Sequence, residues 1–144
     1  MARPHGRQPM VITHEGGLRF AAQIRSHRLI VDQPAGVGDD SGPMPLELIG
    51  ASLGTCVALY VQQFCEARGL PYEGMRVELD TVGAQNPGRI AQFLVRVQLP
   101  VALPPQYAEL IERVARSCPA HNTLVHGAEV AVSIETPAAA AASA

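Results

Sequence analysis

The chain has 144 residues, of which 47% are hydrophobic, and it carries a formal net charge of −2. A chain of this size can bury one hydrophobic core but hardly two, so we expect a single domain. The scattered arginines form no basic face, so we do not expect it to bind nucleic acid. No stretch reaches the roughly 18 apolar residues of a membrane span and no signal peptide is recognisable, which predicts a cytoplasmic protein with no membrane partner. The chain contains no lysine, which excludes Schiff-base chemistry and a P-loop.

The N-terminal third predicts a three-stranded β-meander. Short β-prone pieces are interrupted by Gly16-Gly17 and Ser26-His27, and they read MVITH (10–14), LRFAAQI (18–24) and RLIVD (28–32). The next stretch, QPAGVGDDSGPMP (33–45), is dense in Gly, Pro and Asp and predicts a loop.

The middle of the chain predicts a buried helix followed by a strand pair. Residues 47–68 are apolar on more than one face, and Gly69 supplies a stop. Alternating patterns in GMRVELDTV (74–82) and RIAQFLVRVQL (89–99) predict antiparallel strands joined through GAQNPG (83–88).

The last third predicts a helix and a strand. Apolar residues from Tyr107 to Ala115 fall at helical spacing in a stripe that would continue onto Cys118, and AEVAVSIE (128–135) alternates as a strand does. The elements together predict an α+β fold. We take residues 1–136 as the domain and 137–144 as a disordered, Ala-rich tail.

Three cysteines without a secretory signal argue against a disulfide framework and leave catalysis, metal binding or packing. Cys65 lies nine residues after Cys56, on the opposite side of one helix, and is interpreted as a packing residue. Cys56 lies in GASLGTCVALY, where glycines each cost a helix about 1 kcal/mol. A helix break near Gly54 could give the Cys56 thiol free N–H groups that stabilise a thiolate; the alternative is a close helix crossing that needs small residues.

Cys118 precedes a proline in SCPAHNTL, which predicts that it caps a new helical turn where negative charge is favoured. Two such thiols can reduce a peroxide without any metal or organic cofactor, because one becomes a sulfenic acid and the other condenses with it. Two alternatives stay open. Cys118 and His121 have a C-x-x-H spacing that could be completed as a metal site by Cys56, His27 and His126, and a Cys-His-acid hydrolase is also conceivable.

The stretches PLELIGASLGTCVAL and CPAHNTL closely resemble the two cysteine motifs of the OsmC/Ohr family, the osmotically induced and organic hydroperoxide resistance proteins. The resemblance implies that Cys56 is the peroxidatic cysteine and Cys118 the resolving one. It also implies an intertwined homodimer with antiparallel sheets wrapped around two buried central helices. The implied substrates are organic, fatty-acid-type hydroperoxides, the implied reductants are dithiols such as a lipoylated or thioredoxin-like protein, and the implied role is an antioxidant one in the oxidative stress response.

The chain also departs from the family's peroxidases. Those proteins have a glutamate at the position of Leu46, and their catalytic arginine comes from the N-terminal turn. Glu47 is the adjacent match for the glutamate, and Arg19 is a loose match for the arginine. The other arginines that could support Cys56 are Arg25 and Arg28. Residues His27 and Asp32 resemble the pattern of the less characterised OsmC-like branch.

The sequence leaves alternatives for the histidines and for the activity. His121 lies one helical turn from Cys118 and could tune that thiol. Because Leu46 replaces a carboxylate, the alternative function is a non-catalytic, dimeric protein that senses redox state or binds a small hydrophobic ligand.

Overall fold

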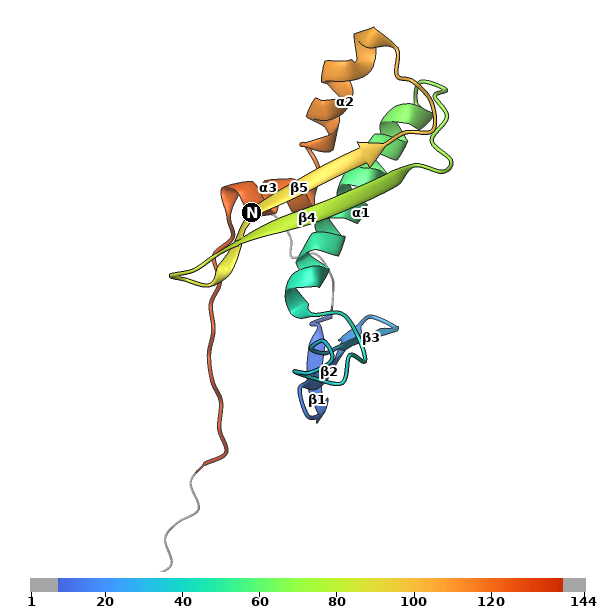
Figure 1. Ribbon diagram of the computed structural model, residues 1–144. Helices are drawn as coiled ribbons and strands as arrows, with labels where there is room; N and C mark the ends of the chain where they lie inside the picture. Colours follow the sequence, from blue (N-terminus) through green and yellow to red (C-terminus); the bar gives the residue numbers. More distant parts are fainter. Residues whose placement is uncertain (1–7, 139–144) are drawn as a thin grey trace, which may run out of the picture.

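The computed structural model describes residues 8–138 and contains two antiparallel sheets and three α-helices in that range (Figure 1). The expected α+β fold is confirmed. Most of the tail predicted at 137–144 lies outside the described residues. The elements in chain order are β1 (Val11–Gly16), β2 (Arg19–Ile24), β3 (His27–Val31), α1 (Pro45–Glu66), β4 (Arg76–Ala84), β5 (Arg89–Gln98), a 3₁₀ turn η1 (Pro105–Tyr107), α2 (Ala108–Ala115) and α3 (Pro119–His126).

The N-terminal meander is confirmed as the sheet β1-β2-β3, in which neighbouring strands pair antiparallel. The first turn passes through Gly17, whose φ of +54° lies in the left-handed region that glycine adopts without strain. Figure 1 shows this sheet beyond the first turn of α1, at the opposite end of the helix from α2.

The loop that leads from β3 to α1 is held by a buried carboxylate. Asp32 is 1% exposed and accepts the backbone N–H groups of Gln33 at 2.7 Å and Ser41 at 3.0 Å. These N–H bonds, Ser41 first, lower the pKa of the Asp32 carboxyl below its ordinary 3.8. The loop is also tightly packed, since a Cβ on Gly42 would overlap the carbonyl of Ile30.

Helix α1 is continuous, so the expected break near Gly54 is wrong. The two interior glycines have a packing reason instead. A Cβ on Gly50 would lie 3.1 Å from Leu79 of β4, and one on Gly54 would lie 3.8 Å from both Leu79 and Val77. Small residues therefore let β4 approach the helix, so the alternative is right that close packing needs small residues, but the neighbour is a strand and not a second helix.

Helix α1 is buried on one side and open on the other within the single chain. Its buried side carries Leu53, Val57, Val61, Phe64 and Cys65, whereas Leu46, Ile49 and Leu59 are exposed. The expectation of burial on more than one face is therefore met only in part. By length and mean hydropathy (1.4) this helix could cross a membrane, but a core helix passes the same test.

The strand pair and the C-terminal helices pack on α1. β4 and β5 pair along their length, as predicted, and α1 contacts β4, β5, α2 and α3. The predicted helical stripe does not continue onto Cys118, because α2 ends at Ala115 and a new helix begins at Pro119. The core is thus centred on α1, and each later element is placed against it.

The predicted last strand does not form within the single chain. Residues 127–138 have neither helix nor strand, and they run away from the other elements (Figure 1). The apolar positions Val130, Val132 and Ile134 are at least 80% exposed. A strand needs a neighbour for its backbone hydrogen bonds, and this segment pairs with no other strand among residues 8–138.

Candidate functional site

The thiols of Cys56 and Cys118 lie next to one another. Cys56 projects from the middle of α1 and is half-buried, and Cys118 is fully buried at the N-cap of α3. Cys56 packs against the core cluster that contains Cys118, the neighbouring Cys56 thiol raises the pKa of the Cys118 thiol, and both cysteines are free. Two thiols from helices far apart in the sequence therefore meet in one chain.

Cys118 occupies the helix cap that the sequence predicts. Pro119 is the first residue of α3, and the Cys118 sulfur accepts the backbone N–H of His121 at 3.3 Å. The expected stabilisation of a thiolate there is nevertheless wrong. Burial raises the pKa of the Cys118 thiol above its ordinary 9.0, the neighbouring Cys56 raises it further, and the N–H bond from His121 only opposes this.

Cys65 is a packing residue, as expected. It is fully buried in the core, and burial raises its thiol pKa, opposed by the charge of Arg68. The Arg68 guanidinium lies 3.8 Å from the centre of the Phe64 ring. Cys65 therefore has a packing role, and it lies nine residues along α1 from Cys56.

The predicted Arg19 and Glu47 do not lie beside Cys56 within one chain. The Arg19 guanidinium donates to the Ser41 hydroxyl at 3.5 Å and to the Glu15 carbonyl at 3.4 Å. The Glu47 carboxylate accepts the backbone N–H of Met44 at 2.8 Å and so caps α1. Nine residues of helix separate Glu47 from Cys56, about 13 Å along the axis and half a turn around it.

The competing arginines also lie in the N-terminal sheet. Arg28 forms an exposed ion pair with Glu15 at 2.8 Å, and Arg25 lies in the turn between β2 and β3. His27 is exposed at the start of β3. The structure of a single chain therefore does not choose among the three arginines.

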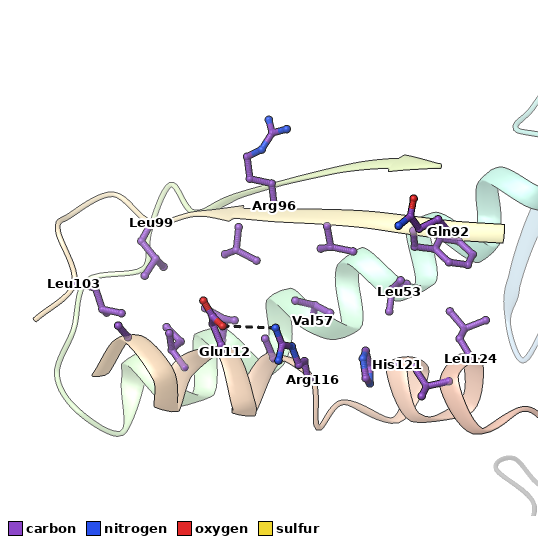
Figure 2. A pocket seen from close by; sticks show the side chains of 18 of the residues that line it. Leu53, Val57, Gln92, Arg96, Leu99, Leu103, Glu112, Arg116, His121 and Leu124 are labelled. Carbon is purple, nitrogen blue, oxygen red and sulfur yellow. Dashed lines mark ion pairs between the residues drawn. The ribbon is translucent and has the colours of Figure 1, made fainter. Parts of the chain in front are cut away.

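A cavity of about 1030 Å³ lies between α1, β5 and the two C-terminal helices, and neither Cys56 nor Cys118 is among its lining residues. Leu53 and Val57 form its apolar wall, and Glu112 and Arg116 pair at 3.6 Å along α2 (Figure 2). Figure 2 shows the His121 ring rising from α3 into this space. Its Nδ1 is buried and finds no hydrogen-bond partner among residues 8–138.

Sequence reasoning singled out His121 through its spacing from Cys118 but could not place its ring in a cavity. It also noted Asp32 only as part of a pattern. A carboxylate directly before a loop rich in Gly and Pro is the signal that could have identified Asp32 as the anchor of that loop.

The metal alternative is not supported within residues 8–138, because no group of three or more His, Cys, Asp or Glu side chains there is placed to hold an ion. His27 lies on β3 in the N-terminal sheet and His126 is exposed at the end of α3, so these two histidines do not complete a metal site with Cys118 and His121.

Comparison with solved structures shows the same fold in several bacterial proteins. A protein from Psychrobacter arcticus, provisionally assigned to osmotic stress induction and the detoxification response, aligns with a TM-score of 0.75 at 20% identity, covering 83% of this chain and 89% of that one. An OsmC-like protein from Mycoplasma pneumoniae gives 0.70 at 17% identity, covering 84% and 89%. An organic hydroperoxide resistance protein from Elizabethkingia anophelis gives 0.54 at 19% identity, covering 83% and 89%.

Comparison at the level of sequence adds the family. No curated protein matches the chain. The sequence model of OsmC-like proteins, however, matches residues 38–133, a range that includes α1, the strand pair and both C-terminal helices. The chain therefore belongs to the OsmC-like protein family.

Proposed function

We propose that the protein is a thiol-dependent peroxidase that reduces organic, fatty-acid-type hydroperoxides. The Cys56 thiolate attacks the terminal peroxide oxygen, the O–O bond breaks, and the alkoxide leaves as an alcohol after taking a proton. Cys56 becomes a sulfenic acid. The Cys118 sulfur then displaces hydroxide from it, giving a Cys56–Cys118 disulfide and water, and a dithiol such as a lipoylated or thioredoxin-like protein returns both thiols.

The observation that carries this proposal is the contact between the two free thiols. A resolving cysteine must reach the sulfenic acid without large rearrangement, and Cys118 is already beside Cys56. Membership of the OsmC-like family and the hydroperoxide resistance role named for structural relatives support the same chemistry. The reaction as written needs only the hydroperoxide and the dithiol.

We propose further that the working form is an intertwined homodimer in the cytoplasm. The single chain leaves apolar surface on α1, at Leu46, Ile49 and Leu59, and along residues 130–134. A second copy that covers these surfaces would also bring another N-terminal sheet near the thiols. Arg19 is our candidate for the guanidinium that favours the Cys56 thiolate, and Glu47 would act with it beyond its capping of α1.

The test is peroxide consumption with cumene hydroperoxide, recycled either by dihydrolipoamide or by thioredoxin. We expect turnover by the wild type, none by Cys56→Ser, and loss of disulfide formation in Cys118→Ser. Cys65→Ala is the matched control and should turn over as the wild type does, since nine residues of helix, about 13 Å along the axis, separate Cys65 from Cys56. Consumption by Cys56→Ser at the wild-type rate would rule the mechanism out.

A second candidate function is a non-catalytic dimer that senses redox state or binds a small hydrophobic ligand. The specific observation in its favour is the cavity of about 1030 Å³ with Leu53 and Val57 in its wall. Native mass spectrometry of gently purified protein distinguishes the two. A retained apolar ligand together with no peroxide turnover would select this candidate.

A further inference from the structure

We propose that His121 is the acid–base residue of the resolving step, in which it takes the proton of the Cys118 thiol and returns it to the departing hydroxyl. This inference rests on the proposed peroxidase function and assigns one more residue to it. Histidine is the side chain that most often moves protons near neutral pH.

The position of His121 relative to Cys118 is fixed by the helix start. Cys118 is the N-cap of α3 and His121 is the third helical residue, whose backbone N–H donates to the Cys118 sulfur at 3.3 Å. A side chain at this third position can turn back toward the cap, as it does in a capping box. The ring of His121 is thus carried by the same turn that holds the sulfur.

The second observation is a ring nitrogen without a hydrogen bond. Nδ1 of His121 is buried and lacks a hydrogen-bond partner among residues 8–138, although buried polar atoms are nearly always paired. A histidine needed only for packing would be replaced at lower cost by an apolar residue. The nitrogen is thus free to accept a proton, on a residue whose backbone N–H already contacts the Cys118 sulfur.

The resolving step itself calls for a base. Cys118 is fully buried, and burial together with Cys56 raises its thiol pKa, so the sulfur is protonated at neutral pH and is a poor nucleophile. In the proposed step the His121 ring turns back toward the cap, and Nδ1 takes the Sγ proton as Cys118 attacks the Cys56 sulfur. The S–S bond forms, the S–O bond breaks, and the hydroxyl leaves with that proton as water.

The groups that face this region leave His121 as the proton carrier. On α1 the neighbours are Leu53, Val57 and the thiol of Cys56. On α2 Glu112 and Arg116 pair with one another at 3.6 Å and are each 69% exposed. β5 contributes Arg96, which is bound to Glu78 at 2.8 Å and is 65% exposed.

The test is a single turnover of reduced protein with one equivalent of cumene hydroperoxide. Sulfenic acid on Cys56 is trapped with dimedone, and the disulfide is followed by mass spectrometry from pH 5 to pH 10. In His121→Gln we expect normal formation of the sulfenic acid but disulfide formation slower by about 10²-fold at pH 7, the usual size of general-base catalysis. The deficit should shrink at high pH, where Cys118 ionises without help.

Chemical rescue supplies the readout that a structural role would not move. His121→Ala leaves space in a cavity of about 1030 Å³, and added imidazole should restore the resolving rate in proportion to its concentration. His126→Ala is the matched control, because His126 is exposed at the far end of the same helix, and imidazole should not affect it.

The two proposals fail in different ways. The role of His121 is wrong, and the peroxidase stands, if His121→Gln and His121→Ala form the disulfide at the wild-type rate. The same conclusion follows if their disulfide formation is slowed equally at every pH and imidazole does not restore it. If the wild type yields neither a dimedone adduct nor a disulfide, the peroxidase itself is wrong.

Discussion

The thiol of Cys118, at the N-cap of α3, neighbours the thiol of Cys56, which projects from the middle of α1 and packs against the core cluster that contains Cys118. Cys56 sits on a continuous helix and Cys118 on a helix cap, so the packing of α3 against α1 holds the pair together. The two sulfurs also differ in environment, because Cys118 is fully buried and Cys56 is not.

The first prediction concerns this difference. Burial favours the neutral thiol, so the folded pKa of Cys118 lies above its ordinary 9.0. The neutral Cys118 thiol therefore makes its full contribution to folding stability below pH 9.0, and this contribution is lost as the pH rises through the pKa of Cys118 in the folded protein. Peptide-resolved alkylation with iodoacetamide should modify Cys56 first and Cys118 with a midpoint above pH 9.0. In urea the two should react alike, and a folded-state midpoint below 9.0 for Cys118 would contradict the assignment.

The second prediction concerns the glycines of α1. Replacing glycine by alanine in a helix gains about 1 kcal/mol when the new Cβ has space. Gly54→Ala should stabilise the protein by up to about 1 kcal/mol, because its Cβ would meet β4 at ordinary van der Waals distance. Gly50→Ala should gain less or lose, since its Cβ would lie 3.1 Å from Leu79. Urea unfolding of the two variants side by side measures the order, and the reverse order would show that β4 does not set these positions.

Local patterns in the sequence predicted most of the fold. The alternation in β4 and β5, the punctuation of the meander and Pro119 at the start of α3 each depend on neighbouring residues, and each is confirmed. The prediction of a strand at residues 128–135 was wrong although their alternation is just as clear. A strand also needs a partner strand, and the described part of the chain supplies none.

The candidate site was predicted unevenly for the same reason. Motif resemblance brought Cys56 and Cys118 together, and the structure places them side by side. The glycines around Gly54 suggested a helix break. They are explained instead by close packing against Leu79, which belongs to a strand later in the chain. The protonated state of Cys118 depends on its burial by the whole core, which spacing along the sequence cannot express.

The third prediction concerns the loop before α1. The Asp32 carboxyl has a lowered pKa because of the N–H groups of Ser41 and Gln33, so its stabilising effect is present above its ordinary pKa of 3.8 and is lost as the pH falls through the folded value. Asp32→Asn should lower the Tm at pH 7 and reduce the further loss on going from pH 5 to pH 2. Calorimetry at several pH values measures both. The exposed Asp39→Asn in the same loop is the control, and equal pH profiles for Asp32→Asn and the wild type would rule out the anchor.

The fourth prediction concerns the segment at 128–135 and the proposed dimer. Val130, Val132 and Ile134 are exposed at alternating positions, so in a strand all three would face the same side, with Ser133 on the other. Val132→Asp should weaken the dimer at least about tenfold, because burying one valine contributes about 1.5 kcal/mol and a charge there adds a penalty.

Ser133→Asp adds the same charge one residue away and is the matched control, which should leave the dimer intact. Sedimentation velocity over a range of concentrations measures both variants. Equal weakening by the two substitutions would mean that charge alone acts and that no face of this segment is buried. A wild-type protein that sediments as a monomer at every concentration would remove the dimer, and with it the possibility that Arg19 reaches Cys56 from a second copy.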